Sequence, residues 1–204
     1  MIVLYDFPLS INAYKIRLML SLLKLPHTLR QIAMRKAEHK AAEHLRRHPF
    51  GKVPVLADGD VLIWDSQAIL VYLARRYGGE AWLPGDPLGQ ARVASWLSVA
   101  SDEVHHSLFQ ARATKLFGFD SGTPLHVLHQ RGQALLETLD RHLANCAWLA
   151  AERPTVADVA VFPGVAHAGD GGIEMQRYAA VDAWLGRMSR LPGYASMDGG
   201  EARP

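Results

Sequence analysis

Ser10 and Asn12 stand where a short apolar run gives way to a helical pattern, a position from which a polar side chain can do chemistry. A hydroxyl or amide at a helix start lies beside free backbone N–H groups and the positive end of the helix dipole. Such a group can donate to a bound thiolate and lower the pKa of the thiol from about 8.5 toward neutrality. Tyr5 is the competing hydroxyl, but it falls inside the apolar run, where a core or turn role is expected. The same residue types also serve as ordinary helix caps.

Asp65 and Ser66 open a second helical pattern and suit an amino-acid head group. The Ser66 hydroxyl and the free N–H groups of a helix start can donate to the carboxylate of that group, and the Asp65 carboxylate can accept from its ammonium. The alternative interpretation is an N-cap with no ligand.

Pro54 interrupts a run, residues 53–56, that otherwise has the composition of a strand. Proline has no N–H to give to a sheet ladder, so the sequence predicts either an edge position or a cis peptide bond. A cis Val53–Pro54 bond would leave the N–H and C=O of Val53 free to pair with an extended peptide. A plain edge-strand proline is the alternative.

The histidines and the cysteine predict neither a metal site nor a disulfide. His44 and His48 have i, i+4 spacing and His105 and His106 are adjacent, but no HExxH motif or Cys/His set accompanies them, so we expect solvated faces. Cys146 is the single cysteine, which excludes a disulfide within the chain, and we expect it to be a small buried hydrophobe.

The apolar periodicity predicts two domains. Residues 1–79 form an α/β domain of βαβαββα order, with strands at 1–5 and 28–32, helices from Ser10 and over 38–47, a hairpin around Asp58-Gly59, and a helix from Asp65 to Gly78. Residues 80–87 are rich in proline and glycine and form a linker. Residues 88–204 form an all-α domain, with helices over 88 to about 116, 124–143 and 181–191 and a capping-box helix that opens at residues 155–158.

The composition is that of an ordinary globular protein, 49% hydrophobic and 21% charged. Lys and Arg number 22 and Asp and Glu 20, and this net charge of +2 is too small to make nucleic acid or an anionic membrane the expected partner. Residues 1–80 carry twelve Lys and Arg against seven Asp and Glu, a net of +5. No leader-like segment or long apolar run is present, so we expect a cytoplasmic protein.

The order of these motifs resembles the cytosolic glutathione S-transferase family, in particular its bacterial, serine-type, beta- or nu-like members. The segments that carry the resemblance are 8–17, 48–56, 63–73, 154–161 and 178–194. The resemblance implies a thioredoxin-like N-terminal domain, an all-helical C-terminal domain, a homodimer, and glutathione as co-substrate without a metal. Glutathione is anionic, which fits the positive charge of the first domain.

The resemblance also implies roles for single residues. Ser10 becomes the hydroxyl donor to the glutathione sulfur, with Asn12 as helper or substitute. By the same resemblance, Val53 and cis-Pro54 receive the cysteinyl backbone of glutathione. Asp65 and Ser66 bind its γ-glutamyl group. Lys52 binds its glycine carboxylate, with His39 or Lys40. In a dimer, Asp102 or Glu103, expected in the middle of a helix, reaches the γ-glutamyl ammonium bound by the other subunit.

The expected activity is conjugation of the glutathione thiolate to a small electrophile that lies between the two domains. The apolar wall expected around it consists of Phe7, Leu9, Phe109, Leu116, Phe117 and Phe119. One alternative uses the same thiolate for disulfide or peroxide reduction or for isomerisation. Another is a non-catalytic protein that keeps the fold for binding or dimerisation, although such a protein tends to lose the set formed by Ser10, Val53-Pro54 and Asp65-Ser66.

Overall fold

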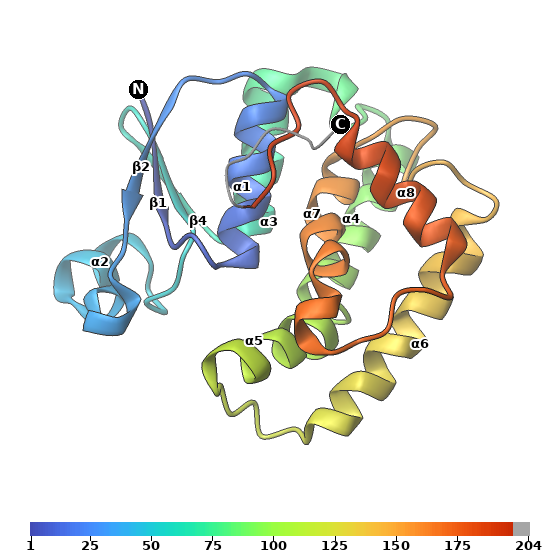
Figure 1. Cartoon of the computed structure of the whole chain (residues 1–204). Coiled ribbons are helices and arrows are strands. Elements are labelled where there is room, and N and C mark those ends of the chain that lie inside the picture. The colour runs from blue at the N-terminus through green and yellow to red at the C-terminus, as the bar shows by residue number, and fades with distance from the viewer. Residues whose placement is uncertain (198–204) are drawn as a thin grey trace. The chain divides into compact units, whose positions relative to one another are not determined.

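The computed structural model describes residues 1–197, and these form two compact units (Figure 1). The first unit contains the residues up to Gly79 together with the described residues from Leu191 onward. The second unit is Glu80–Arg190. Residues 88–204 were expected to form the helical domain, whereas the described residues from Leu191 onward belong to the first unit.

The first unit is a thioredoxin-like domain with a four-stranded mixed sheet, which confirms the predicted fold class. Its strands have the order β2-β1-β3-β4, and β1 pairs with β2 in parallel and with β3 antiparallel. Its elements are β1 (Ile2–Asp6), α1 (Ile11–Leu22), β2 (His27–Gln31), α2 (Ala42–Arg47), β3 (Val55–Asp58), β4 (Val61–Trp64) and α3 (Ser66–Leu73).

The buried sides of these elements follow from their sequence patterns. Residues of β1 alternate between buried and half-buried, and Leu4 at its centre is fully enclosed. The predicted hairpin joins β3 and β4, and its Gly59 has a φ of +59°, as a tight hairpin turn requires. Helices α1 and α3 pack side by side on one face of the sheet (Figure 1), so their N-terminal ends belong to one framework.

The predicted helix over 38–47 forms only in part. The chain makes 3-10 turns at Met34–Lys36 and Glu38–Lys40, and α2 begins at Ala42. The Glu38 carboxylate accepts from the Ala33 N–H at 2.8 Å, and Ala41 is extended. A local side-chain hydrogen bond to the backbone thus replaces the first part of the helix.

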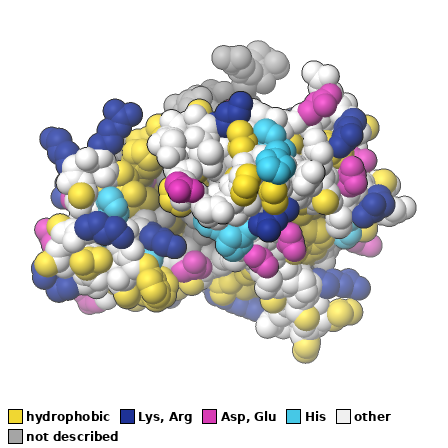
Figure 2. All heavy atoms as spheres, turned by 90° about the horizontal axis from the view of Figure 1, so that it is seen from below, with side chains coloured by type: hydrophobic (Ala, Val, Ile, Leu, Met, Phe, Trp, Pro, Cys, Tyr) yellow, Lys and Arg dark blue, Asp and Glu magenta, His cyan; other side chains and the backbone are white. Residues whose placement is uncertain are grey.

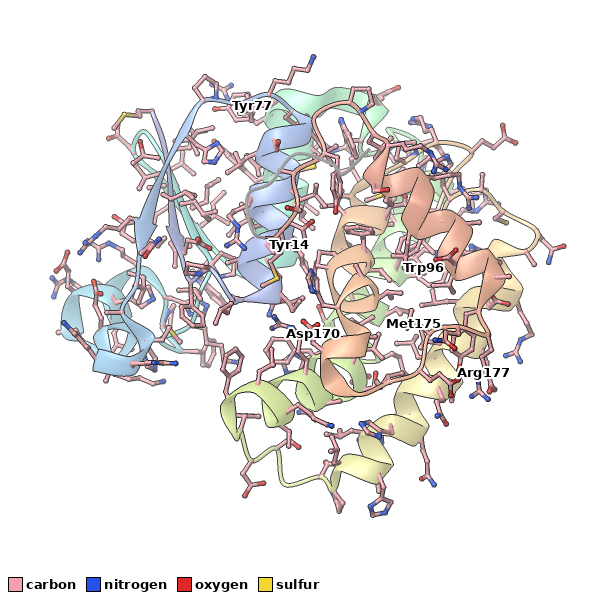
Figure 3. All side chains as sticks on the ribbon, in the orientation of Figure 1. Tyr14, Tyr77, Trp96, Asp170, Met175 and Arg177 are labelled. Atoms are coloured by element: carbon pink, nitrogen blue, oxygen red, sulfur yellow. The ribbon has the colours of Figure 1, made fainter. Side chains whose placement is uncertain are left out.

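The described C-terminal segment packs on α1. A Cβ added to Gly193 would lie 2.7 Å from the Ser21 carbonyl oxygen, which shows how closely the two backbones approach. The Tyr14 hydroxyl, on α1 (Figure 3), donates to the Ala195 carbonyl oxygen at 2.9 Å. Tyr14 is therefore 1% exposed and engaged within the first unit.

The second unit is helical, as predicted. Its helices are α4 (Pro87–Ser101), α5 (Gln110–Phe117), α6 (Leu125–Leu143), α7 (Val156–Ala166) and α8 (Ala179–Ser189). The single helix expected over 88–116 is interrupted, because the chain turns after Ser101 and then makes a wider π-helical turn, His105–Phe109. Helix α7 is buried along its length and packs beside α4 (Figure 1). No helix within residues 1–197 is both long and apolar enough to cross a membrane.

Candidate functional site

Ser10 is the N-cap of α1, and its side chain is half-buried at the end of the β1–α1 loop. Its Oγ accepts from the Ala13 N–H at 3.2 Å, and its own N–H donates to the Phe7 carbonyl at 2.8 Å. Within the described chain no acceptor takes the Ser10 hydroxyl proton, so this O–H is available to an external acceptor. Asn12, in the first turn, is half-buried.

Arg17 fixes the loop that carries Ser10. Its guanidinium pairs with Asp6 and also donates to the Pro8 carbonyl oxygen at 2.8 Å. Burial raises the pKa of Asp6, and the Arg17 charge opposes that rise. One cation on α1 thus connects the end of β1 to the turn before the helix.

Asp65 is the N-cap of α3 and is exposed. Its Oδ1 accepts from the N–H groups of Gln67 and Ala68 at 2.9 and 3.1 Å, whereas Oδ2 has no partner among residues 1–197. Its φ of +75° is unusual for a residue other than glycine, and such backbone strain is concentrated at functional sites. The Ser66 side chain beside it is buried, at 5% exposure.

The Val53–Pro54 peptide bond is cis, one of the two forms that the sequence predicted. Strand β3 begins only at Val55, and no hydrogen bond to another described residue engages the N–H or C=O of Val53. The edge of the first unit therefore offers a free backbone donor and acceptor at this residue.

The predicted basic residues lie at one place in the first unit. A Cβ on Gly51 would meet the His39 carbonyl oxygen at 2.6 Å and the Lys40 side chain at 3.2 Å, so the 3-10 turn of His39 and Lys40 touches the loop before Lys52. Burial, followed by the nearby Lys40 and His44 charges, lowers the pKa of His39. Lys52 is exposed. Figure 2 shows Lys and Arg side chains over the part of the first unit that carries α2.

His44 and His48 are buried, at 1% and 4% exposure, so the expectation of solvated faces was wrong for them. His44 Nε2 lies 2.8 Å from the Lys52 carbonyl oxygen, and the His48 ring packs on Trp64 with centroids 5.1 Å apart. Burial, then the charges of His44 and Lys52, lowers the pKa of His48. Both rings support the loop of Lys52 from inside the unit.

Two expectations about the second unit were also wrong. Asp102 caps the C-terminal end of α4, and Glu103 lies in the following turn, so neither is mid-helix. Both side chains are exposed, and the Asp102 carboxylate accepts from His106 Nδ1 at 2.8 Å. Cys146 is exposed rather than buried, because it lies in the surface turns that follow α6.

The predicted apolar wall is divided between the units. In the first, Phe7 is half-buried and Leu9 is 43% exposed. In the second, the Phe109 ring stacks on His105 with centroids 4.6 Å apart. Leu116, Phe117 and Phe119, at the end of α5 and just beyond it, are 47 to 49% exposed. Among residues 1–197 no three His, Cys, Asp or Glu side chains are grouped so that they could hold a metal ion.

Comparison with known proteins finds relatives for both parts of the chain. Residues 1–75 match the family described as "Glutathione S-transferase, N-terminal domain", and residues 128–192 match "Glutathione S-transferase, C-terminal domain". A probable glutathione S-transferase, GSTF2, of Oryza sativa subsp. japonica is 34% identical over 158 residues, which are 73% of each chain. A maleylacetoacetate isomerase of Rhizobium meliloti (strain 1021) is 31% identical over 173 residues, 81% of each chain. The crystal structure of a glutathione S-transferase from Pseudomonas fluorescens aligns with a TM-score of 0.89 and 30% identity, covering 96% of this chain and 98% of that one.

Proposed function

Because the chain belongs to the glutathione S-transferase family, we propose that it binds glutathione on its first unit, holds it as the thiolate and transfers it to a small electrophile. The observation that carries this proposal is that several polar groups of the first unit have unused hydrogen-bonding capacity. The Ser10 hydroxyl proton, Asp65 Oδ2 and the Val53 backbone have no partner within the described part of the chain, and a tripeptide offers a complement to each.

The expected contacts follow the chemistry of glutathione. The γ-glutamyl ammonium pairs with Asp65 Oδ2, and its carboxylate accepts from the Ser66 hydroxyl and N–H at the start of α3. The cysteinyl backbone pairs with Val53 as an added strand beside cis-Pro54. The glycine carboxylate lies against Lys52, with His39 or Lys40.

The thiol of bound glutathione loses its proton to water, and the Ser10 hydroxyl donates a hydrogen bond to the resulting thiolate and stabilises it, aided by the N-terminal end of α1. The thiolate then attacks an electrophilic carbon. A C–S bond forms, and the displaced electron pair leaves with a leaving group or moves onto a conjugated carbonyl. Asn12, in the first turn of α1, is the substitute donor. The two tyrosines of this region have other partners. The Tyr14 hydroxyl donates to the C-terminal segment, and the Arg47 guanidinium lies over the Tyr5 ring, with its Cζ 4.6 Å from the ring centroid.

The remaining parts of the proposal concern the surroundings of the thiolate. On the first unit, the electrophile packs on Phe7 and Leu9, the apolar residues that precede Ser10. The protein is a cytoplasmic homodimer of the beta- or nu-like kind, in which exposed Asp102 or Glu103 approaches the γ-glutamyl ammonium held by the other subunit. Light scattering that returned a monomer at every concentration would remove the shared contact.

Isomerisation is the second candidate, favoured by the relative named as a maleylacetoacetate isomerase. In that reaction the thiolate adds to a conjugated double bond, the resulting single bond rotates, and the thiolate leaves again, so that glutathione is regenerated. The two reactions need the same first unit and differ only in the fate of the adduct.

Calorimetric titration with glutathione, followed by a substrate screen, tests the proposal. The screen contains an aromatic halide, a cis-enone, a disulfide and a peroxide. Consumption of glutathione with the halide indicates transferase activity. Turnover of the enone without consumption of glutathione indicates isomerisation. Oxidation of glutathione in the presence of the disulfide or the peroxide indicates that the protein reduces that substrate. Absence of glutathione binding would refute the proposal, and binding without any turnover would favour the non-catalytic alternative.

A further inference from the structure

Lys15 is the most anomalous charged residue of the first unit. Its side chain, in the middle of α1, is 2% exposed, and no hydrogen bond or ion pair joins it to another described residue. An ammonium removed from water without a partner is strongly destabilising, and buried lysines are normally paired. Its neighbours along the helix, Tyr14 and Ile16, are buried as well. The fold therefore keeps a cation where packing alone favours an apolar side chain.

The helix geometry directs this cation toward the proposed glutathione site. Side chains of an α-helix lean toward its N-terminus, so the long Lys15 chain runs toward the end of α1 that Ser10 caps, five residues earlier. Helix α3, capped by Asp65, packs against α1. Lys15 thus leans toward the N-terminal end of α1, and this end and that of α3 carry the proposed ligand contacts.

Electrostatics connects Lys15 to Asp65. Burial lowers the pKa of Lys15 from 10.5 to about 8, and the one charge that opposes this shift is that of Asp65. The Lys15 side chain is 2% exposed, so its ammonium keeps almost no contact with water.

We propose that Lys15 binds the α-carboxylate of the γ-glutamyl group, so that Asp65 and Lys15 together hold this head group as a zwitterion. Asp65 accepts from the ammonium, and Lys15 supplies the positive charge on the other side of the same α-carbon, beside Ser66. The inference rests on the proposed glutathione site and adds a residue that determines its specificity. It explains why an unpaired cation is retained: its partner arrives with the ligand.

Two truncated peptides separate this role from a structural one. The 4-aminobutyryl analogue of glutathione lacks the α-carboxylate, and the glutaryl analogue lacks the α-amino group. Wild-type protein should bind the 4-aminobutyryl analogue at least tenfold more weakly than glutathione. Lys15→Met, which keeps the length of the side chain, should weaken glutathione and the glutaryl analogue at least tenfold and leave the 4-aminobutyryl analogue within twofold. Asp65→Asn should weaken glutathione and the 4-aminobutyryl analogue and spare the glutaryl analogue.

The matched control is Lys24→Met, which removes the same charge from an exposed position just beyond the other end of α1 and should change none of these affinities. Equal weakening of all three peptides by Lys15→Met, or no weakening, would overturn the inference. So would a wild-type protein that binds glutathione and the 4-aminobutyryl analogue equally, a result that needs no variant to fold. Wild-type protein that binds none of the peptides would instead refute the glutathione site itself.

Discussion

Helices α3 and α7 each begin at a cap that contains an aspartate, and the two caps differ in what their carboxylates contact. At the start of α7, Asp158 is fully buried and both of its carboxylate oxygens accept hydrogen bonds. Oδ1 accepts from the Leu149 N–H and from Trp184 Nε1, both at 3.0 Å. Oδ2 accepts from the Thr155 N–H at 2.9 Å and from the Thr155 hydroxyl at 3.2 Å. At the start of α3, Asp65 is exposed, uses one oxygen for the helix and leaves the other free. The first carboxylate is part of the folded core, whereas the second is available to a ligand.

An aspartate at a helix start serves folding when donors within the chain occupy both of its oxygens, and it can serve binding when one oxygen has no donor. Four donors meet at Asp158, and their hydrogen bonds oppose the larger effect of burial, which raises the pKa of this carboxyl group. Near Asp65 the balance is reversed: an acceptor lacks a donor, and the Lys15 ammonium lacks an acceptor. A free acceptor and a free cationic donor in the same unit are what a zwitterionic ligand requires.

The largest expected effect is that of Asp158→Asn on stability. The amide presents a donor where the Thr155 N–H and hydroxyl need an acceptor, so the unfolding free energy should fall by about 3 kcal/mol. Chemical denaturation measures it. A loss below about 1 kcal/mol would mean that the α7 cap is not the folding element described here.

Lys15→Met should stabilise the protein while it weakens ligand binding. Since the folded pKa of Lys15, about 8, lies below the ordinary 10.5, the variant should gain up to about 3 kcal/mol at pH 7. Between pH 8 and 10.5 the unfolded wild-type chain binds more protons than the folded one, so wild-type stability rises and the advantage of the variant shrinks. Denaturation at pH 7 and pH 10 checks the sign. If the variant is less stable than the wild type by the same free energy at both pH values, Lys15 is paired in the folded protein.

The same substitution at the other cap, Asp65→Asn, should have the opposite profile to Asp158→Asn. The amide keeps an oxygen for the α3 N–H groups and tolerates a positive φ, so stability should change by less than about 1 kcal/mol. Glutathione affinity should fall by about 1.5 to 3 kcal/mol through loss of a charge-assisted contact. Calorimetry and denaturation on one preparation give both numbers. An unchanged affinity would remove Asp65 from the site.

Ser10→Ala should have the smallest effect on binding and act mainly on rate. Loss of one hydrogen bond to the thiolate raises the pKa of the bound glutathione thiol by about one to two units. The rate with an electrophile at pH 7 should therefore fall about ten- to a hundredfold. Glutathione affinity should change little, and the rate should recover at high pH. Asn12→Ala and Tyr5→Phe are the matched variants. If either of them loses the rate while Ser10→Ala keeps it, that residue is the donor.

The sequence predicted the elements that carry strong local signals. The hairpin at Asp58-Gly59, the caps at Ser10 and Asp65 and the capping box at Thr155 each occur where their turn or cap chemistry indicated. Pro54 indicated an edge or a cis bond, and the cis bond is present. Local chemistry therefore determined most element positions and the order of the fold.

Burial was harder to predict, because it depends on distant elements. The i, i+4 spacing of His44 and His48 places them on one side of the chain but does not say that the Lys52 loop and Trp64 cover that side. Cys146 was expected inside because of its type, yet it lies on a surface turn. Lys15 gave no signal, since a lysine on a helix is normally solvated and its 2% exposure appears only in the folded chain.

The central claim is that the first unit holds glutathione as a thiolate, and titration of the ultraviolet absorbance of bound thiolate against pH tests it most directly. The wild-type complex should titrate one to two pH units below the ordinary thiol pKa of about 8.5, and the Ser10→Ala complex should titrate near it. A wild-type complex in which the bound thiol titrates near 8.5 would contradict the account.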